Sequence, residues 1–208
     1  VFDVPAYGYV RSIVLVVDSS GGAGAATAHE DAPWSVLKNI ALTEPNGAVI
    51  SQFNSGKDLY LANKWGGYRW AGGADPAASP VYSAPATGGA FRFLIRIPVE
   101  LNLRDGLGSL PNQNAAATFK LRLTLGKAAD VWTSPPATTL PNIRVRAFIE
   151  AWDQPESQSA GQTNQITPPA MNTTQFWSSQ IYNVNQGNQT VRLTRVGNYI
   201  RNLILVYR

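Results

Sequence analysis

The sequence predicts an all-β protein, an antiparallel β-sandwich of jelly-roll type. Short apolar segments of strand length recur between loops rich in glycine and proline, of which the chain has 18 and 14. This composition is typical of β-structure. Several segments alternate apolar and polar residues, the pattern of a strand with one buried face. Helical periodicity is almost absent, so two packed antiparallel sheets are the simplest arrangement that buries these strands.

The first predicted strand is the apolar run at residues 12–18, which is consistent with burial on both faces. Residues 19–28 form a loop of small residues. Their Gly/Ala-rich stretch follows a strand, as in a dinucleotide-binding fingerprint, but that motif needs a helix at its last glycine. No amphipathic helix fits before Pro33, so we reject a dinucleotide site.

A hairpin and one short helix follow. Residues 36–43 and 48–53 are strands, and the intervening Glu44-Pro45-Asn46-Gly47 is a turn, because proline fixes φ and Asn-Gly supplies left-handed residues. Ser55 is expected to cap a helix in which Leu59, Ala62 and Trp65 share one face. The two glycines after Trp65 end that helix.

Three further strands alternate clearly, at residues 91–101, 118–125 and 143–152. Pro98 lacks a backbone donor and indicates an edge strand or a bulge near the end of the first of them. Residues 69–90, 103–114 and 126–142 are predicted loops. The following side chains from these strands are expected in the core: Phe93, Ile95, Phe119, Leu121, Leu123, Val145 and Ile149.

The composition becomes polar after Trp152. The sequence therefore predicts a first jelly-roll domain at residues 1–155, a linker at 156–175 and the incomplete beginning of a second jelly-roll domain at 176–208. Strands are expected in this last part at residues 176–184, 190–196 and 199–207.

An internal repeat supports the tandem arrangement. Residues 37–42 and 200–205 share the order aliphatic, basic, Asn, aliphatic, small or aliphatic, Leu. We expect the two segments to occupy equivalent strands, with Asn39 matching Asn202 and Lys38 matching Arg201. Three strands cannot close a sandwich, so we expect the chain to be part of a longer polypeptide or to pair with another chain.

Composition and charge exclude several classes of protein. There is no cysteine, so no disulfide framework exists, and no apolar run is long enough to span a membrane as a helix. The formal net charge of +4 comes from basic residues that are scattered singly. Scattered charge is typical of a solvated surface, and we expect no sequence-specific binding of nucleic acid.

Candidate catalytic residues are few. His29 is the only histidine, so neither a usual zinc site nor a well-oriented Ser-His-Asp triad can be built, and we expect it to be exposed. Glu100 and Glu150 both lie on strands, as paired carboxylates do in β-sandwich glycosidases. Arg96, Arg144 and Arg146 are equally good ion-pair partners for them. We therefore predict no enzyme activity and no cofactor or metal.

Four aromatic residues, Trp34, Trp65, Tyr68 and Trp70, lie close together in the sequence. Such side chains can stack on sugar rings, which is one interpretation. The other is that they pack the end of the sandwich or a subunit contact, where aromatic residues are enriched.

The chain resembles the double jelly-roll major capsid proteins of tailless icosahedral viruses with an internal membrane, the tectivirus and adenovirus lineage. The resemblance covers most of residues 10–155 and the start of a second barrel, and it departs from the family in length. Residues 97–114 and five shorter motifs carry the resemblance. The motifs are Pro-Trp at 33–34, Lys-Asn-Ile at 38–40, Asn-Gly at 46–47, Ser-Gly-x-Asp-Leu-Tyr at 55–60 and Asn-Lys-Trp-Gly-Gly-Tyr at 63–68.

This resemblance implies a viral structural protein, such as a bacteriophage capsid subunit, that assembles in the host cytoplasm and resides in the virion. Two barrels per subunit, taken three times around an axis, would give a trimeric pseudo-hexagonal capsomer of an icosahedral shell. The implied partners are neighbouring capsomers, minor capsid proteins and an underlying lipid membrane. The alternative is a carbohydrate-binding or glycan-cleaving jelly roll that uses Trp34, Trp65 and Trp70.

Overall fold

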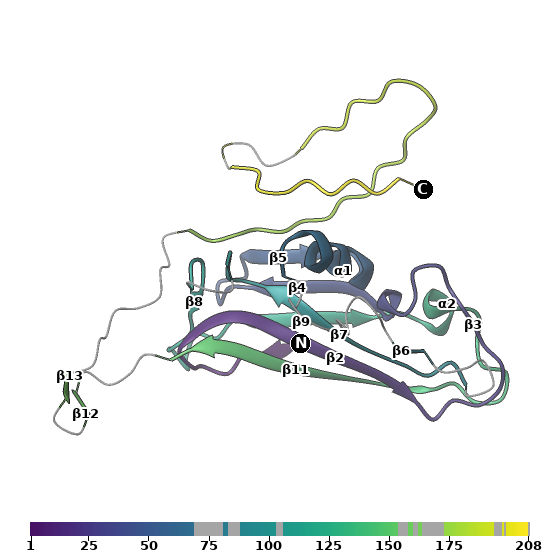
Figure 1. Ribbon diagram of the computed structural model, residues 1–208, viewed down its shortest axis with the longest axis horizontal. Helices are drawn as coiled ribbons and strands as arrows, with labels where there is room; N and C mark the ends of the chain where they lie inside the picture. The colour runs from purple at the N-terminus through teal and green to yellow at the C-terminus, as the bar shows by residue number, and fades with distance from the viewer. Residues whose placement is uncertain are drawn as a thin grey trace.

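The protein is a two-layered antiparallel β-sandwich (Figure 1). One sheet has four strands in the order β1-β9-β4-β5, and the other has the order β11-β2-β7-β6 with β8 paired to β2. The computed structural model describes residues 1–68, 81–82, 88–102, 106–153, 158–159, 162–163, 173–193, 197 and 199–207.

The elements have the following bounds. The first sheet contains β1 (Phe2–Asp3), β9 (Lys120–Leu125), β4 (Leu37–Thr43) and β5 (Val49–Phe53). The second contains β11 (Asn142–Trp152), β2 (Tyr9–Ser20), β7 (Phe91–Pro98), β6 (Val81–Tyr82) and β8 (Leu110–Pro111). Two small pairs join β3 (Thr27–Ala28) to β10 (Trp132–Ser134) and β12 (Gln158–Ser159) to β13 (Gln162–Thr163). The helices are η1 (Trp34–Val36), α1 (Gly56–Trp65) and α2 (Ala128–Val131).

The chain winds back and forth between the two sheets. It enters the second sheet with β2, crosses to the first with β4 and β5, returns with β6 and β7, crosses again with β9 and ends in β11. This winding between two antiparallel sheets is that of a jelly roll. The predicted fold class is confirmed for the sandwich.

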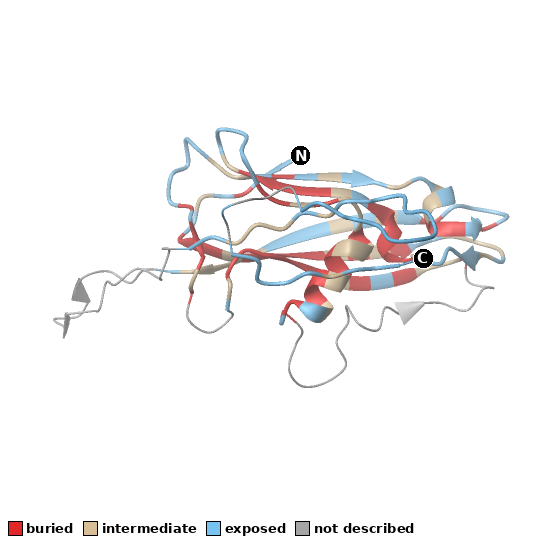
Figure 2. Ribbon diagram, turned by 90° about the horizontal axis from the view of Figure 1, so that it is seen from above, coloured by how far each residue is buried: buried red, intermediate tan, exposed pale blue. Residues whose placement is uncertain are grey.

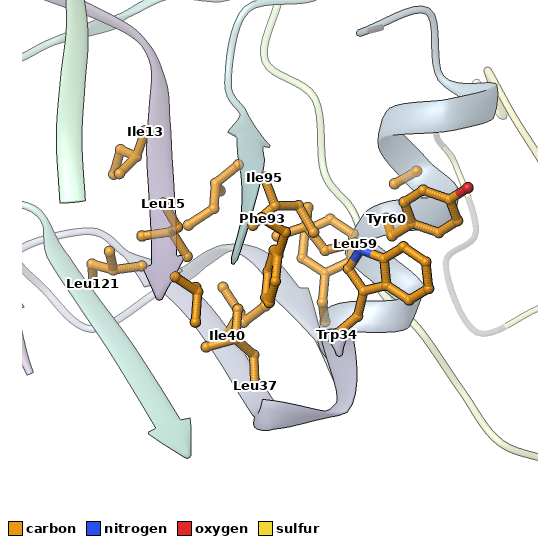
Figure 3. Close-up of a cluster of buried hydrophobic side chains, with 14 of the residues drawn as sticks. Ile13, Leu15, Trp34, Leu37, Ile40, Leu59, Tyr60, Phe93, Ile95 and Leu121 are labelled. Atoms are coloured by element: carbon orange, nitrogen blue, oxygen red, sulfur yellow. The ribbon is translucent and has the colours of Figure 1, made fainter. Parts of the chain in front are cut away.

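The core fills the space between the sheets, where the buried stretches of the ribbon face one another (Figure 2). Ile13 and Leu15 of β2 and Phe93 and Ile95 of β7 are at most 1% exposed. They meet side chains from the opposite sheet, including the fully buried Ile40 (Figure 3). Complete burial of an aliphatic or aromatic side chain stabilises the fold by about 1.5–3 kcal/mol before entropy is counted.

The core prediction is correct for the residues at the centre of the sandwich, whereas the residues predicted at its margins are only partly buried. Phe93, Ile95 and Leu121 are buried, whereas Phe119, Leu123, Val145 and Ile149 are half-buried and pack against the core. The cause is strand position. β11 is the outermost strand of its sheet, and β1 pairs with β9 only at Lys120 and Leu121, so later residues of β9 lack a neighbour on that side.

The predicted hairpin between β4 and β5 is confirmed. Gly47 has a φ of 91°, the left-handed value that the turn requires. The amide of Glu44 donates to the carbonyl of Ala48 at 2.8 Å, and the side-chain oxygen of Asn46 accepts from the amide of Ala48, also at 2.8 Å. Residue-level turn chemistry therefore sets the register of these two strands.

The predicted helix exists, but one member of its buried face is wrong. Ser55 caps α1 by accepting from the amide of Asp58 at 3.1 Å, and Leu59 and Ala62 are buried. Trp65 is 61% exposed. At about 100° per residue, Trp65 lies about 120° around the helix from Leu59, so it points away from the core.

The loops hold more structure than predicted. The region 126–142 contains α2 and β10, and β8 lies within 103–114, of which residues 103–105 fall outside the described part. Most of the predicted 69–90 loop also lies outside the described residues, although β6 belongs to it. These additions are short pairs and turns that satisfy backbone groups at both ends of the sandwich (Figure 1).

The predicted strands at 176–184, 190–196 and 199–207 are wrong for this chain: the described residues of these segments form no helix or strand. A strand needs a neighbouring strand to pair with. Among the described residues of these segments, only Trp177 pairs, through a single parallel bridge to Ser51. β12 and β13 lie within the predicted linker. The domain boundaries at 155 and 176 stay predictions.

Candidate functional site

The C-terminal arm, defined as the described residues 173–193, 197 and 199–207, is the most unusual part of the molecule. It runs in extended form past β5 and α1 (Figure 1) and is exposed along most of its length (Figure 2). Two groups of contacts attach it to the sandwich, and both between and beyond them it presents apolar side chains to solvent. We therefore treat the arm and its attachments as the candidate site.

The first attachment covers the free edge of β5. The amide of Gln52 donates to the carbonyl of Trp177 at 2.9 Å, and the amide of Asn54 donates to Ser179 Oγ at 2.8 Å. The side-chain amide of Asn54 also donates to the carbonyl of Ser179 at 2.7 Å. β5 is an outer strand whose backbone groups would otherwise lack partners, so this part of the arm protects a sheet edge.

Gln175 joins the arm to the segment after β7 and to Tyr68, just after α1. Its Nε2 donates to the carbonyls of Val99 and Glu100 at 3.0 and 2.8 Å. Its Oε1 accepts from the hydroxyl of Tyr68 at 2.6 Å and from the indole N–H of Trp177 at 3.0 Å. Both ends of one amide are thus engaged, which fixes the point where the arm begins.

The second attachment lies at the C-terminal end of α1. Arg201 donates to the hydroxyl of Tyr68 at 2.6 Å, and its guanidinium lies 5.5 Å from the centre of the same ring. The guanidinium also lies 3.4 Å from the carbonyl oxygen of Gly66, and the Asn202 amide lies 3.4 Å from that of Trp65. Carbonyls at a helix C-terminus carry partial negative charge, so a cation there is stabilising.

Large apolar side chains project from the arm into solvent. Ile181 is 83% exposed, Leu205 is 80% exposed and Tyr207 is 89% exposed. Exposed large apolar side chains, when they gather in one contiguous patch, are a feature of interaction sites. Further exposed members are Tyr182, Val184, Val191, Leu193, Tyr199, Ile200, Leu203 and Val206.

The predicted aromatic residues lie in different surroundings. Trp34 is buried and stacks on Tyr60 with ring centres 4.2 Å apart, and the Lys57 ammonium lies 4.7 Å from the Trp34 ring centre (Figure 3 shows the stack). Trp65 is exposed, with the Lys64 ammonium 5.1 Å from its ring. Each ring therefore has a cation nearby, an arrangement that stabilises both partners.

Tyr68 belongs to the arm attachment rather than to a surface platform. It is 5% exposed and meets Trp177 edge-on at 6.4 Å. Trp70 lies outside the described residues. Within the described part of the chain, no ring contact joins Trp34, Trp65 and Tyr68 to one another, and the sugar-binding interpretation of the set stays a prediction.

The two candidate carboxylates are each held by their own arginine. Glu100 is completely buried, bonds Arg11 Nε at 2.7 Å and accepts from the indole N–H of Trp152 at 3.0 Å. Glu150 pairs with Arg96 at 3.0 Å. Burial of a carboxylate requires this kind of compensation. The arrangement explains both residues as parts of structural ion pairs.

His29 is exposed, as predicted, and the Asp31 amide lies 3.5 Å from its Nδ1. The part of the chain that the structure describes holds no group of three His, Cys, Asp or Glu residues that could bind a metal ion. Among the described helices, none is long and apolar enough to cross a membrane.

Sequence reasoning did not find the attachment residues Gln175, Trp177 and Ser179. They lie in and just after a stretch that is poor in apolar residues and matches a linker. The sequence feature that could have indicated this attachment is Trp177, since a large aromatic residue just after a polar segment needs a place to pack.

Comparison with known proteins finds similarity to solved structures. No protein-family model and no curated protein matches the chain. The crystal structure of the STIV MCP, a major capsid protein, aligns with 73% of this chain at 16% sequence identity and a TM-score of 0.46. The alignment covers 42% of that protein, so the chain spans less than half of its length. An identity this low does not transfer a function.

Proposed function

We propose that this protein is a structural subunit of a virus capsid, which works by self-association rather than catalysis. The observation that carries the proposal is the C-terminal arm, an extended segment that is held at two places and exposes apolar side chains such as Ile181 and Leu205. The motifs at residues 33–68, which resemble those of double jelly-roll major capsid proteins, point in the same direction.

The proposed mechanism is geometric. Two barrels side by side in each subunit and three subunits around an axis produce a pseudo-hexagonal capsomer that tiles an icosahedral facet. The residues of the arm supply a strand to a second barrel, which pairs their backbone and buries their apolar side chains. Neighbouring capsomers, minor capsid proteins and a lipid membrane beneath the shell are the proposed partners, and a virion of the tectivirus and adenovirus type is the proposed location.

The candidate carboxylates support a structural role. Glu100 is fully buried against Arg11 and Trp152, and Glu150 is bound by Arg96. A general acid or nucleophile for glycoside hydrolysis must reach the sugar. Glu100→Gln and Glu150→Gln are accordingly expected to leave assembly and any binding unchanged.

Sedimentation velocity on the purified chain tests the proposal. We expect a trimer or larger species at micromolar concentration. Leu205→Asp should shift it towards monomer, because a charge cannot be buried in an apolar contact. Leu125→Asp is the matched control, since Leu125 is a half-exposed leucine of the sandwich outside the arm.

A wild-type chain that stays monomeric and is retained on a polysaccharide column would contradict the capsid proposal and favour a sugar-binding jelly roll. An assembly that is equally sensitive to both leucine substitutions would also contradict the assigned role of the arm. Circular dichroism of each variant checks that the sandwich is intact.

A further inference from the structure

A hollow of about 460 Å³ lies at one end of the second sheet and is rich in arginine. Its lining includes Asp18 of β2, Arg92 of β7 and both Arg144 and Arg146 of β11. These side chains alternate along their strands with core residues, so they lie on the face of the sheet that points away from the core. None of them takes part in the arm attachments.

The strand register gathers these charges. Asp18 is directly opposite Arg144 on one side and Arg92 on the other, and Arg146 lies two residues along β11 from Arg144. Cross-strand neighbours and residues two apart share one face of a sheet. Three guanidinium groups therefore surround one carboxylate, which leaves a local charge of +2.

Both carboxylate oxygens of Asp18 already take part in ion pairs. Arg92 Nε bonds one oxygen of Asp18 at 3.0 Å, and Arg146 Nη2 bonds the other at 2.9 Å. Arg144 is exposed and has no ion-pair partner in the described part of the chain. Since a guanidinium carries five N–H groups, Arg92 and Arg146 also keep donors that Asp18 does not occupy.

Neutral donors lie beside the arginines. Ser20 and Asn142 are directly opposite each other across β2 and β11, and both line the hollow. Both are exposed, and within the described residues neither side chain has a hydrogen-bond partner. A hydroxyl and a carboxamide are thus available for an anion that enters between the arginines.

We propose that this hollow binds a phosphate group. The local charge of +2 matches a phosphate monoester or inorganic phosphate, whose charge near neutral pH is about −1.5 to −2. Guanidinium groups bond phosphate oxygens through paired N–H groups, and donors on three neighbouring strands can reach different oxygens of a tetrahedral anion. The proposal is independent of the capsid function. The phosphate belongs either to the free ion or to a lipid headgroup.

Isothermal titration calorimetry of the 208-residue chain with inorganic phosphate, at constant ionic strength set by chloride, tests the proposal. Arg144→Gln should weaken phosphate binding at least fivefold. The affinity of Arg144→Lys should lie between that of this variant and that of the wild type, because lysine keeps the positive charge but lacks the paired N–H groups of a guanidinium. Arg122→Gln is the matched control, because Arg122 is also an exposed strand arginine but lies on the other sheet. It should change binding less than twofold.

Phosphate binding that is absent above the chloride background, or that weakens equally in Arg144→Gln and Arg122→Gln, would overturn the proposal. So would binding of a polyglutamate peptide in the absence of phosphate binding, since the hollow would then select carboxylates. Flotation with phosphatidic acid vesicles, against phosphatidylcholine vesicles, separates the two sources. Flotation that depends on Arg144 assigns the lipid headgroup, and phosphate binding without flotation assigns the free ion.

Discussion

Gln175 shows how much one side chain can hold in place. Its amide donates to two carbonyls of the segment after β7 and accepts from Tyr68 and Trp177. Tyr68 is almost completely buried, so its hydroxyl loses a partner inside the structure if Gln175 is removed. The residue therefore acts on the arm and on the sandwich together.

Gln175→Ala should lower the free energy of unfolding by about 1–3 kcal/mol, because buried polar groups lose their partner. It should also make the arm more sensitive to proteolysis. Urea denaturation and limited trypsin digestion measure the two effects. Gln113→Ala, at an exposed glutamine in a loop, serves as the control and should change neither. Equal behaviour of the two variants would show that Gln175 does not hold the arm.

Asp130, in the first turn of α2, gives a prediction about pH. The Lys38 ammonium bonds one carboxyl oxygen of Asp130 at 2.7 Å and the Lys127 amide donates to the other at 2.8 Å. These two contacts lower the pKa of Asp130, with the Lys38 side chain the larger cause. Because the folded-state pKa is lowered, the stabilising effect is present above the unfolded-state pKa and is lost as the pH falls through the folded-state pKa.

Lys38→Ala should therefore raise the pKa of Asp130 towards its ordinary value while leaving it partly lowered by the Lys127 amide. An NMR titration of the Asp130 carboxyl carbon measures this. Lys57→Ala, which removes a lysine from α1, should leave the titration unchanged. A wild-type titration curve in the Lys38 variant would contradict the assigned cause.

At the scale of elements, β9 contains its own matched comparison. Leu121 and Leu125 lie on the same face of this strand, but Leu121 is 1% exposed and Leu125 is 47% exposed. Leu121→Ala should lower the free energy of unfolding by about 2–5 kcal/mol, whereas Leu125→Ala should change it by less than about 1 kcal/mol. Thermal and urea unfolding of the two variants provide the measurement. Similar losses would mean that β9 is buried evenly along its length.

Alternation in the sequence was enough to predict β9 and β11, where one face packs on the core and the other is largely exposed. β4 and β7 each bury four successive residues, and their apolar runs of strand length were the signal that predicted them. The turn at Asn46-Gly47 was predictable for a local reason, its demand for positive φ. Trp65 was wrongly assigned to the buried face because each step of three residues advances about 300° around a helix with 3.6 residues per turn. Two such steps, from Leu59 to Ala62 and on to Trp65, therefore move the side chain off the face of Leu59.

The attachment residues and the arginine hollow lay beyond sequence reasoning. Gln175 acquires its role from Tyr68, which is 107 positions away, and Arg146 meets Asp18 across 128 positions. Such pairs depend on which strands become neighbours. Residues 199–207 carry a strand pattern without a strand, because pairing needs a partner that the described part of this chain does not provide.

For the whole molecule, the arm divides into a part that protects β5 and a part that reaches solvent. A chain that ends after Ser179 keeps the contacts of Gln175, Trp177 and Ser179, and its melting temperature should stay close to that of the full chain. A chain that ends after Asp153 loses them and exposes the β5 edge, so it should be less stable by about 1–3 kcal/mol and aggregate. Calorimetry and light scattering compare the two. Aggregation of the longer truncation alone would contradict this division.

The position of β2 in the middle of its sheet has a consequence during synthesis. β2 is the first strand of its sheet to leave the ribosome, yet its longest pairing is with β11, and Asp18 must wait for Arg146, which is synthesised 128 positions later. At about 5–20 residues per second, that wait is roughly 6–25 seconds. Throughout it, the apolar run of β2 is a nascent segment with an unpaired edge. Ribosome-bound chaperones that recognise such segments are therefore expected to engage this chain early and to release it only once Trp152 has emerged.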